Sequence, residues 1–126
     1  MKRIVFLCVE NSNRSQMAEA FARLHGGVEA HSAGSRPSGK VNPKAIEAMR
    51  ELGYDLSTHQ SKSIDDLGDS PFDVAVTMGC GDECPNLRAK RREDWSIPDP
   101  RDMPPEEFCK VRDLIGRNVS ELLQSL

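Results

Sequence analysis

Residues 4–15 read IVFLCVENSNRS, and the residue types in this segment are the strongest indication of how the chain folds. Its first five residues are continuously apolar and rich in β-branched and aromatic side chains, which is typical of a strand buried on both faces. Ser15 begins a segment with apolar residues at helical spacing, namely Met17, Ala18, Phe21 and Leu24. A buried strand, a short loop and a helix together indicate the start of a parallel βαβ unit.

The rest of the chain continues this alternation. We expect strands at residues 28–33 and 72–78 and a short fourth strand near residues 94–97. Helices are expected at residues 15–24, 43–52 and from Pro104 to Leu122, with one helical turn at 63–67. This pattern predicts a three-layer α/β sandwich with a four-stranded parallel sheet. Ligands bind such a sheet at the carboxyl ends of its strands, where Cys8, Gly34 and Gly79 fall.

The composition limits the classes of function. The chain has 126 residues, with 17 Lys and Arg against 20 Asp and Glu, and a net charge of −3. This length predicts a single domain over residues 1–126. We expect no nucleic-acid or membrane partner, because the chain is not basic and no apolar run approaches the ~20 residues of a membrane span. We expect no signal peptide and a cytoplasmic location, where four cysteines point to packing, metal binding or chemistry.

The loop after the first strand has the form of an anion cradle. Cys8 ends the strand, and Arg14 follows just before the helix. A loop that enters a helix N-terminus aims backbone N–H groups inward, so we expect oxyanion binding by Val9, Glu10, Asn11, Ser12, Asn13, Arg14 and Ser15. The same positive field favours the thiolate form of Cys8, which predicts a nucleophile. Ser15 is placed to donate a hydrogen bond to the sulfur, and Arg14 to hold the oxyanion with two.

Three segments resemble one family. Residues 8–20 (CVENSNRSQMAEA), 32–35 (SAGS) and 41–61 (VNPKAIEAMRELGYDLSTHQS) are similar to the arsenate reductases of the low-molecular-weight phosphotyrosine phosphatase superfamily. The resemblance extends to the end of the chain and implies a fold like that of the low-molecular-weight phosphotyrosine phosphatases. It also implies that Asp99 is the general acid, because Asp99-Pro100 matches the Asp-Pro of the family's late loop. From the residues alone, Asp99 would be interpreted as a turn residue.

A second thiol-bearing segment lies in the predicted loop at residues 79–87. Cys80 and Cys84 stand among Gly and polar residues, which favours thiol–disulfide exchange. Zinc is the alternative, but no second Cys or His pair accompanies them, and we expect no metal site. In relatives with an internal thiol relay, a cysteine directly follows the third strand, where this chain has Gly79. Cys84 matches the distal relay cysteine better than Cys80 matches the proximal one, and other relatives use a small thiol instead. Cys109 is expected to be a packing or surface residue.

We consider several further charged and polar positions for a role in binding. Some relatives bind potassium through an Asn, a Glu and a third, acidic residue; Asn11 and Glu19 match the first two, and Lys62 replaces the third. Lys62 either pairs with Glu19 in place of the ion or is a surface lysine, and we predict no potassium requirement.

A basic run is interpreted as a solvated loop or as a patch that steers anions, and it consists of Arg88, Lys90, Arg91 and Arg92. Single histidines, at His31 and His59, are interpreted as structural.

The resemblance and the motifs together predict reduction of arsenate to arsenite for arsenic detoxification. A Cys8 thiol-arsenate adduct would be resolved by Cys80, Cys84 or a small thiol, without a bound cofactor. The external reductant would be thioredoxin, glutathione with glutaredoxin, or mycothiol, and the protein would be a monomer. One alternative is a low-molecular-weight protein tyrosine phosphatase that works through a Cys8 phosphocysteine, although Arg101 stands where those enzymes place an aromatic residue. The other alternative is an oxyanion-binding, redox-sensing module.

Overall fold

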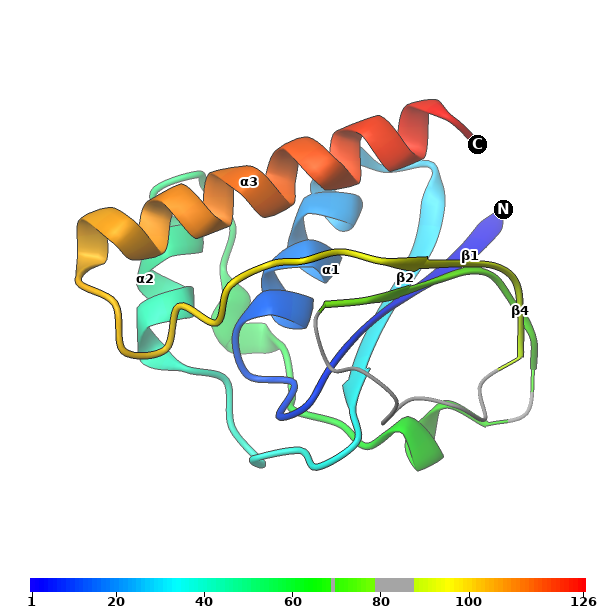
Figure 1. The fold of residues 1–126 in the computed structure, drawn as a ribbon, viewed down its shortest axis with the longest axis horizontal. Coiled ribbons are helices and arrows are strands. Elements are labelled where there is room, and N and C mark those ends of the chain that lie inside the picture. Colours follow the sequence, from blue (N-terminus) through cyan, green and yellow to red (C-terminus); the bar gives the residue numbers. More distant parts are fainter. Residues whose placement is uncertain (69, 79–87) are drawn as a thin grey trace.

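The structure is a computed structural model that describes residues 1–68, 70–78 and 88–126. Strands and helices alternate as the sequence predicts (Figure 1), in the order β1 Lys2–Cys8, α1 Arg14–His25, β2 Val28–Gly34, α2 Pro43–Arg50, β3 Phe72–Thr77, β4 Ala89–Asp94 and α3 Pro105–Gln124. Two 3-10 helices, Leu56–Thr58 and Ile64–Leu67, lie between α2 and β3, and the second is the helical turn expected at 63–67. The predicted loop with Cys80 and Cys84 lies outside the described residues.

Within the described residues, four strands form one parallel sheet in the order β2-β1-β3-β4. β1 is central, and its residues from Ile4 to Cys8 are buried, as the continuous apolar run predicts. The register places Cys8 opposite Gly34 of β2 and Leu7 opposite Thr77 of β3. The carboxyl ends of β1, β2 and β3 therefore meet at one edge of the sheet.

The predicted position of the fourth strand is wrong by about five residues. The strand was expected near residues 94–97, whereas β4 is Ala89–Asp94 and contains most of the basic run that was interpreted as a loop. β4 is the edge strand, and its largely exposed residues need no apolar pattern, because charged side chains protect an edge from pairing with other chains. The apolar residues that suggested a strand lie just after it: the Trp95 N–H still bonds the Thr77 carbonyl at 2.8 Å, and Ile97 is buried.

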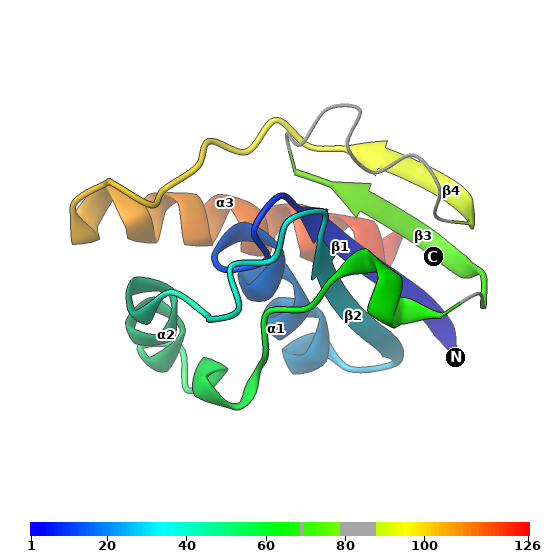
Figure 2. The ribbon, with the colours of Figure 1, turned by 90° about the horizontal axis from the view of Figure 1, so that it is seen from below.

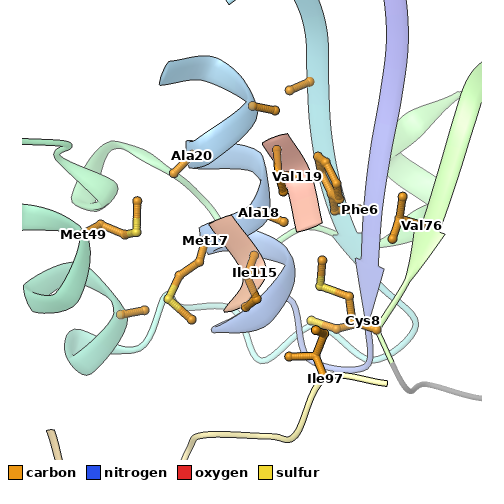
Figure 3. Packing of buried hydrophobic residues seen from close by; sticks show 14 of the residues in the cluster. Phe6, Cys8, Met17, Ala18, Ala20, Met49, Val76, Ile97, Ile115 and Val119 are labelled. Atoms are coloured by element: carbon orange, nitrogen blue, oxygen red, sulfur yellow. The ribbon is translucent and has the colours of Figure 1, made fainter. Parts of the chain in front are cut away.

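The two faces of the sheet are covered unequally. The face with Ile4 and Phe6 shares one buried cluster with residues of all three α-helices (Figure 3), and α3 passes behind the strands in Figure 2. The opposite face, with Val5 and Leu7, packs against the 3-10 helix Ile64–Leu67. The layer on that second side is therefore thin in the part of the chain that is described. None of the helices in the described ranges is long and apolar enough to cross a membrane.

Candidate active site

The loop between β1 and α1 turns its carbonyl oxygens away from its concave side. The Val9 carbonyl accepts the Arg36 backbone N–H at 2.8 Å, and the Ser12 carbonyl accepts the Asn42 N–H at 3.0 Å. The other carbonyls accept from Ser38 N and Ser61 Oγ (to Glu10), Gln16 Nε2 (to Asn11) and Met17 N (to Asn13). Since neighbouring segments occupy the carbonyls, we infer that the loop's N–H groups face the other side, as in an anion-binding nest.

Two positions allow the loop to follow this path. Asn11 has a φ of 51°, in the left-handed region that asparagine adopts more readily than most residues. Gly34 ends β2 beside the loop, and a Cβ atom there would lie 2.5 Å from the Val9 carbonyl oxygen and 3.0 Å from the Asn11 nitrogen. Because both contacts are with backbone atoms, only glycine leaves room for the loop.

A cavity of about 330 Å³ opens against this loop. It lies at the strand edge predicted from the sequence, and its size suits a small polar ligand. It is lined by Cys8, Val9, Glu10, Ser12, Asn13, Arg14, Arg36, Asp99 and Arg101. Segments that are far apart in the sequence therefore share one cavity with the Cys8 thiol.

The Cys8 sulfur has the hydrogen-bond partner that the sequence predicts. The Cys8 Sγ lies 2.8 Å from Ser15 Oγ, and the Asn11 side-chain amide donates to the same hydroxyl at 2.7 Å. Asn11 and Ser15 are completely buried beneath the loop, so their side chains support Cys8 rather than line the cavity. The hydroxyl stabilises a thiolate, because a hydrogen bond to an ionised acceptor is stronger than one to a neutral acceptor.

Arg14, the first residue of α1, has its guanidinium held at the wall of the cavity. Its Nη1 donates to the Met78 carbonyl at 2.6 Å and to the Ile97 carbonyl at 2.9 Å. Ile97 lies next to Cys8 in Figure 3. These bonds connect the helix to the end of β3 and to the segment that leads to Asp99, and they fix the position of the Arg14 positive charge.

Asp99 faces the same cavity as Cys8, as the Asp-Pro resemblance implies. Its side chain is 43% exposed, and its Oδ1 accepts the Arg101 backbone N–H at 3.1 Å. The Arg101 guanidinium also pairs with Glu10 of the loop at 2.9 Å. This ion pair joins the segment of Asp99 to the loop after Cys8, so it keeps a carboxyl group at the cavity opposite the thiol.

The charges of the cavity favour a small oxyanion. Arg14, Arg36 and Arg101 contribute three positive charges to its lining, against the carboxylates of Glu10 and Asp99. Guanidinium groups and loop N–H groups together suit the geometry of a tetrahedral oxyanion. A thiolate beneath such an anion can attack its central atom, and a carboxylic acid at the rim can protonate a departing oxygen.

Glu19 is a buried carboxylate on α1 behind the loop. Its side chain is 3% exposed and accepts from Ser32 Oγ at 2.6 Å and from Arg23 Nε at 2.8 Å. The Lys62 ammonium lies 3.9 Å from Glu19 Oε1. Of the two interpretations of Lys62, the structure favours the ion pair with Glu19, and the absence of a potassium requirement stays a prediction.

The other cysteines differ from Cys8. Cys109 is partly buried on α3 near Glu51, and burial, with a smaller effect of that carboxylate, raises the pKa of the Cys109 thiol and disfavours its thiolate. Cys80 and Cys84 lie outside the described residues. Among residues 1–68, 70–78 and 88–126, no three His, Cys, Asp or Glu side chains form a group that could hold a metal ion.

A parallel α/β sheet with a cysteine at its carboxyl edge, beside a loop of the form that can bind anions, indicates a phosphatase-like class of protein. The chain belongs to the family described as low molecular weight phosphotyrosine protein phosphatase, which matches residues 3–126. It is 41% identical over 130 residues to arsenate reductase 1 of Staphylococcus haemolyticus, covering 99% of this chain and 97% of that protein. It is 44% identical over 120 residues to an arsenate reductase of Staphylococcus aureus, covering 90% of each.

Solved structures resemble the whole chain. An arsenate reductase in the phosphate binding state has a TM-score of 0.91 at 35% identity, covering 99% of this chain and 98% of that chain. An arsenate reductase in the oxidized state has a TM-score of 0.86 at 34% identity, with the same coverage. The thioredoxin-dependent arsenate reductase of Corynebacterium glutamicum has a TM-score of 0.79 at 32% identity, covering 99% of this chain and 61% of that chain. The fold predicted from the sequence is thus confirmed.

The structure adds contacts near the cavity that the sequence did not predict. Arg36 reaches the cavity from the loop after β2, and the available signal was its position two residues after Gly34 at the same sheet edge. Gln16 and His59 lie behind Cys8, joined by a hydrogen bond between His59 Nδ1 and Gln16 Oε1 at 2.9 Å. No local pattern indicates that contact, because it joins residues 43 positions apart.

Proposed function

We propose that the chain reduces arsenate to arsenite, with Cys8 as the nucleophile. The observation that carries the proposal is the single cavity that brings the Cys8 thiol, the anion-binding loop, Arg14 and Asp99 together. Relatives named as arsenate reductases over nearly the whole chain support arsenate as the oxyanion.

In the first step, Cys8 and Asp99 act on bound arsenate. The loop N–H groups and Arg14 hold the arsenate oxygens, and the hydrogen bond from Ser15 favours the Cys8 thiolate. The thiolate forms a sulfur–arsenic bond while one arsenic–oxygen bond breaks. Asp99 donates a proton to the departing hydroxide, which leaves as water. The product is a Cys8 thiol-arsenate adduct in which arsenic is still pentavalent.

In the second step, another thiolate attacks the Cys8 sulfur. A disulfide bond forms and the sulfur–arsenic bond breaks, so its electron pair stays on arsenic. Arsenic is reduced from the pentavalent to the trivalent state and leaves as arsenite, while two thiols are oxidised to one disulfide. The attacking thiol is Cys80, Cys84 or an external small thiol, and Cys84 is the better candidate within the chain.

The cycle requires an external thiol reductant and no bound cofactor. The reductant is thioredoxin, glutathione with glutaredoxin, or mycothiol, and a relative named as thioredoxin-dependent supports an external thiol reductant. A cytoplasmic location suits this chemistry, because thiols stay reduced there. We further propose that the protein acts as a monomer.

The decisive experiment measures arsenite formation with each reductant in turn. Cys8→Ser should lower the rate at least ~10³-fold, because a hydroxyl is a far weaker nucleophile than a thiolate. Cys109→Ser is the matched control and should keep the wild-type rate. In the oxidised enzyme, mass spectrometry should find Cys8 linked to the resolving thiol, and a Cys84→Ser variant should lose an internal link. Substantial arsenite formation by Cys8→Ser would overturn the proposal.

A phosphatase is the second candidate, because the family's description and the Cys8, Arg14 and Asp99 arrangement suit phosphomonoester hydrolysis as well. Hydrolysis of p-nitrophenyl phosphate without arsenite formation, under all three reductants, would favour it. Phosphate binding with neither activity would favour an oxyanion-binding, redox-sensing module.

A further inference from the structure

The Arg101 side chain lies between two sides of the Cys8 cavity. Arg101 Nη1 is 2.9 Å from Glu10 Oε2, on the loop after β1, and Arg101 Nη2 is 4.0 Å from Asp99 Oδ2, on the segment that leads to α3. All three residues line the cavity. The Arg101 guanidinium therefore connects the loop that has the form of an anion cradle to the segment that carries the carboxyl group.

The exposure of these side chains places the guanidinium at the mouth of the cavity. Cys8 is only 3% exposed, so its thiol lies at the floor. The Glu10 and Arg101 side chains are 39% and 52% exposed, and Asp99 is similarly open to solvent. A group that extends outward from a ligand above Cys8 would therefore have to pass Arg101.

The backbone around Arg101 is anchored on both sides. The Arg101 N–H donates to Asp99 Oδ1 at 3.1 Å, and the Arg101 carbonyl accepts from Lys44 Nζ of α2 at 3.0 Å. The Met103 N–H donates to the Pro100 carbonyl at 2.9 Å and closes a turn over residues 100–103. Because these bonds hold the turn, the guanidinium leaves the mouth by rotation of its side chain, which breaks the ion pair with Glu10.

The direction of attack decides what a substrate presents to Arg101. A nucleophile attacks in line with the bond that breaks, so the departing oxygen points away from Cys8 and toward the mouth. In free arsenate or phosphate this oxygen is unsubstituted and can accept a hydrogen bond from the guanidinium, which has several N–H donors. In a phosphomonoester the same oxygen carries the organic group, which would need the space of the Arg101–Glu10 pair.

We propose that Arg101, held by Glu10, is a specificity-determining residue that selects unsubstituted tetrahedral oxyanions over their organic esters. A free oxyanion gains a charge-assisted hydrogen bond at the mouth. An ester loses this bond and must also separate Arg101 from Glu10, so attraction and exclusion act together. This role rests on the proposed binding of an oxyanion above Cys8, and it extends that function by stating which ligands the site rejects.

A purely electrostatic role of the two residues would have a different signature. Loss of the Arg101 charge would weaken the binding of every anion, and loss of the Glu10 charge would strengthen it. The preference between two anions of similar charge would stay the same in both cases, since Arg14 and Arg36 remain in the cavity. If the pair blocks the mouth, either change opens it, and both reduce the preference for the free oxyanion.

The test measures binding and needs neither arsenate nor turnover. Calorimetry on the full-length reduced protein compares inorganic phosphate with phenylphosphonate, which ionises similarly near neutral pH but carries a phenyl group. The wild type should bind phosphate at least ~10-fold more tightly. Arg101→Ala should reduce this preference roughly tenfold, as expected for a lost charge-assisted hydrogen bond. Glu10→Gln should reduce it by about threefold, as expected for a broken, partly exposed ion pair.

Arg50→Ala is the matched control. Arg50 forms an ion pair with Glu47 on the surface of α2, and neither residue lines the cavity, so this variant should keep the wild-type preference. Melting temperatures are recorded for all variants, and Glu10→Gln decides if Arg101→Ala does not fold. As a second readout, Arg101→Ala should hydrolyse p-nitrophenyl phosphate faster than the wild type, relative to its phosphate affinity.

A folded Arg101→Ala protein with the wild-type preference would overturn the inference. So would opposite shifts of the preference in Arg101→Ala and Glu10→Gln, or a wild type that binds both ligands equally well. If the preference changes as expected in a protein that forms no arsenite, the result counts against the proposed reduction and still supports the selection by Arg101.

Discussion

Asp99 depends on neighbouring residues for its position at the cavity. The Arg101 N–H and the ion pair of Arg101 with Glu10 hold it at the cavity, while its side chain stays 43% exposed and can exchange protons with solvent. We expect Asp99→Asn to lower kcat for arsenate reduction about 10²–10⁴-fold, the usual contribution of a general acid. Phosphate binding, measured by calorimetry, should change little, because the loop and Arg14 remain.

The neighbouring Asp102→Asn is a suitable control, since Asp102 is exposed and absent from the lining of the cavity. An Asp99→Asn enzyme with the wild-type kcat would show that another group protonates the departing oxygen.

At the scale of elements, the site depends on the contact between the end of β2 and the loop after β1. Gly34→Ala would place a Cβ atom 2.5 Å from the Val9 carbonyl oxygen, so the loop must move. We expect destabilisation by about 1–3 kcal/mol, typical of overpacking, and loss of most phosphate binding, measured by denaturant unfolding and calorimetry.

Gly116→Ala offers a comparison within the same fold. Its Cβ would meet the Phe21 ring at 2.8 Å, which is a side chain between α3 and α1 rather than the loop backbone. This variant should retain phosphate binding whatever its stability. Wild-type phosphate affinity in Gly34→Ala would show that the close contact between Gly34 and the Val9 carbonyl is not needed for the loop to bind phosphate.

At the scale of the whole molecule, the buried His59 links folding to pH. Its pKa is lowered below the ordinary value of 6.5, chiefly by burial, so below pH 6.5 the unfolded chain binds more protons than the folded protein. The free energy of unfolding should therefore decrease as the pH falls from 7 toward and below 6. Denaturant unfolding should show a smaller decrease in the free energy of unfolding for His59→Asn, whose side chain cannot titrate. An equal decrease in the wild type and in the variant would show that His59 is not the group responsible.

The carboxyl groups of Glu29 and Asp73 affect the stability of the folded protein at lower pH. Hydrogen bonds from Arg3, to the Glu29 side chain and from its backbone to Asp73, lower the pKa of both carboxyl groups. Their contribution to stability is complete above the ordinary values of 4.5 and 3.8 and is lost as the pH falls through the lowered values. The two decreases in stability should therefore occur in separate pH ranges.

Features that are local in the chain could be predicted from the order of the amino acids. The apolar run of β1, the loop and the start of α1 are contiguous, so periodicity and residue type were enough to predict the central strand and the Cys8–Ser15 hydrogen bond. Cys8 and Gly34 could be placed together because parallel strands end at a common edge. Asp99 needed the family resemblance, since an Asp-Pro pair alone is a common turn.

Features that depend on contacts between distant residues could be seen in the folded protein alone. β4 has no apolar pattern because an exposed edge strand does not require one, and so its position could not be predicted. Arg101 reaches the cavity through its ion pair with Glu10, 91 residues away, and His59 joins Gln16 across 43 residues. Side-chain packing sets these distances and orientations, and no spacing along the sequence encodes them.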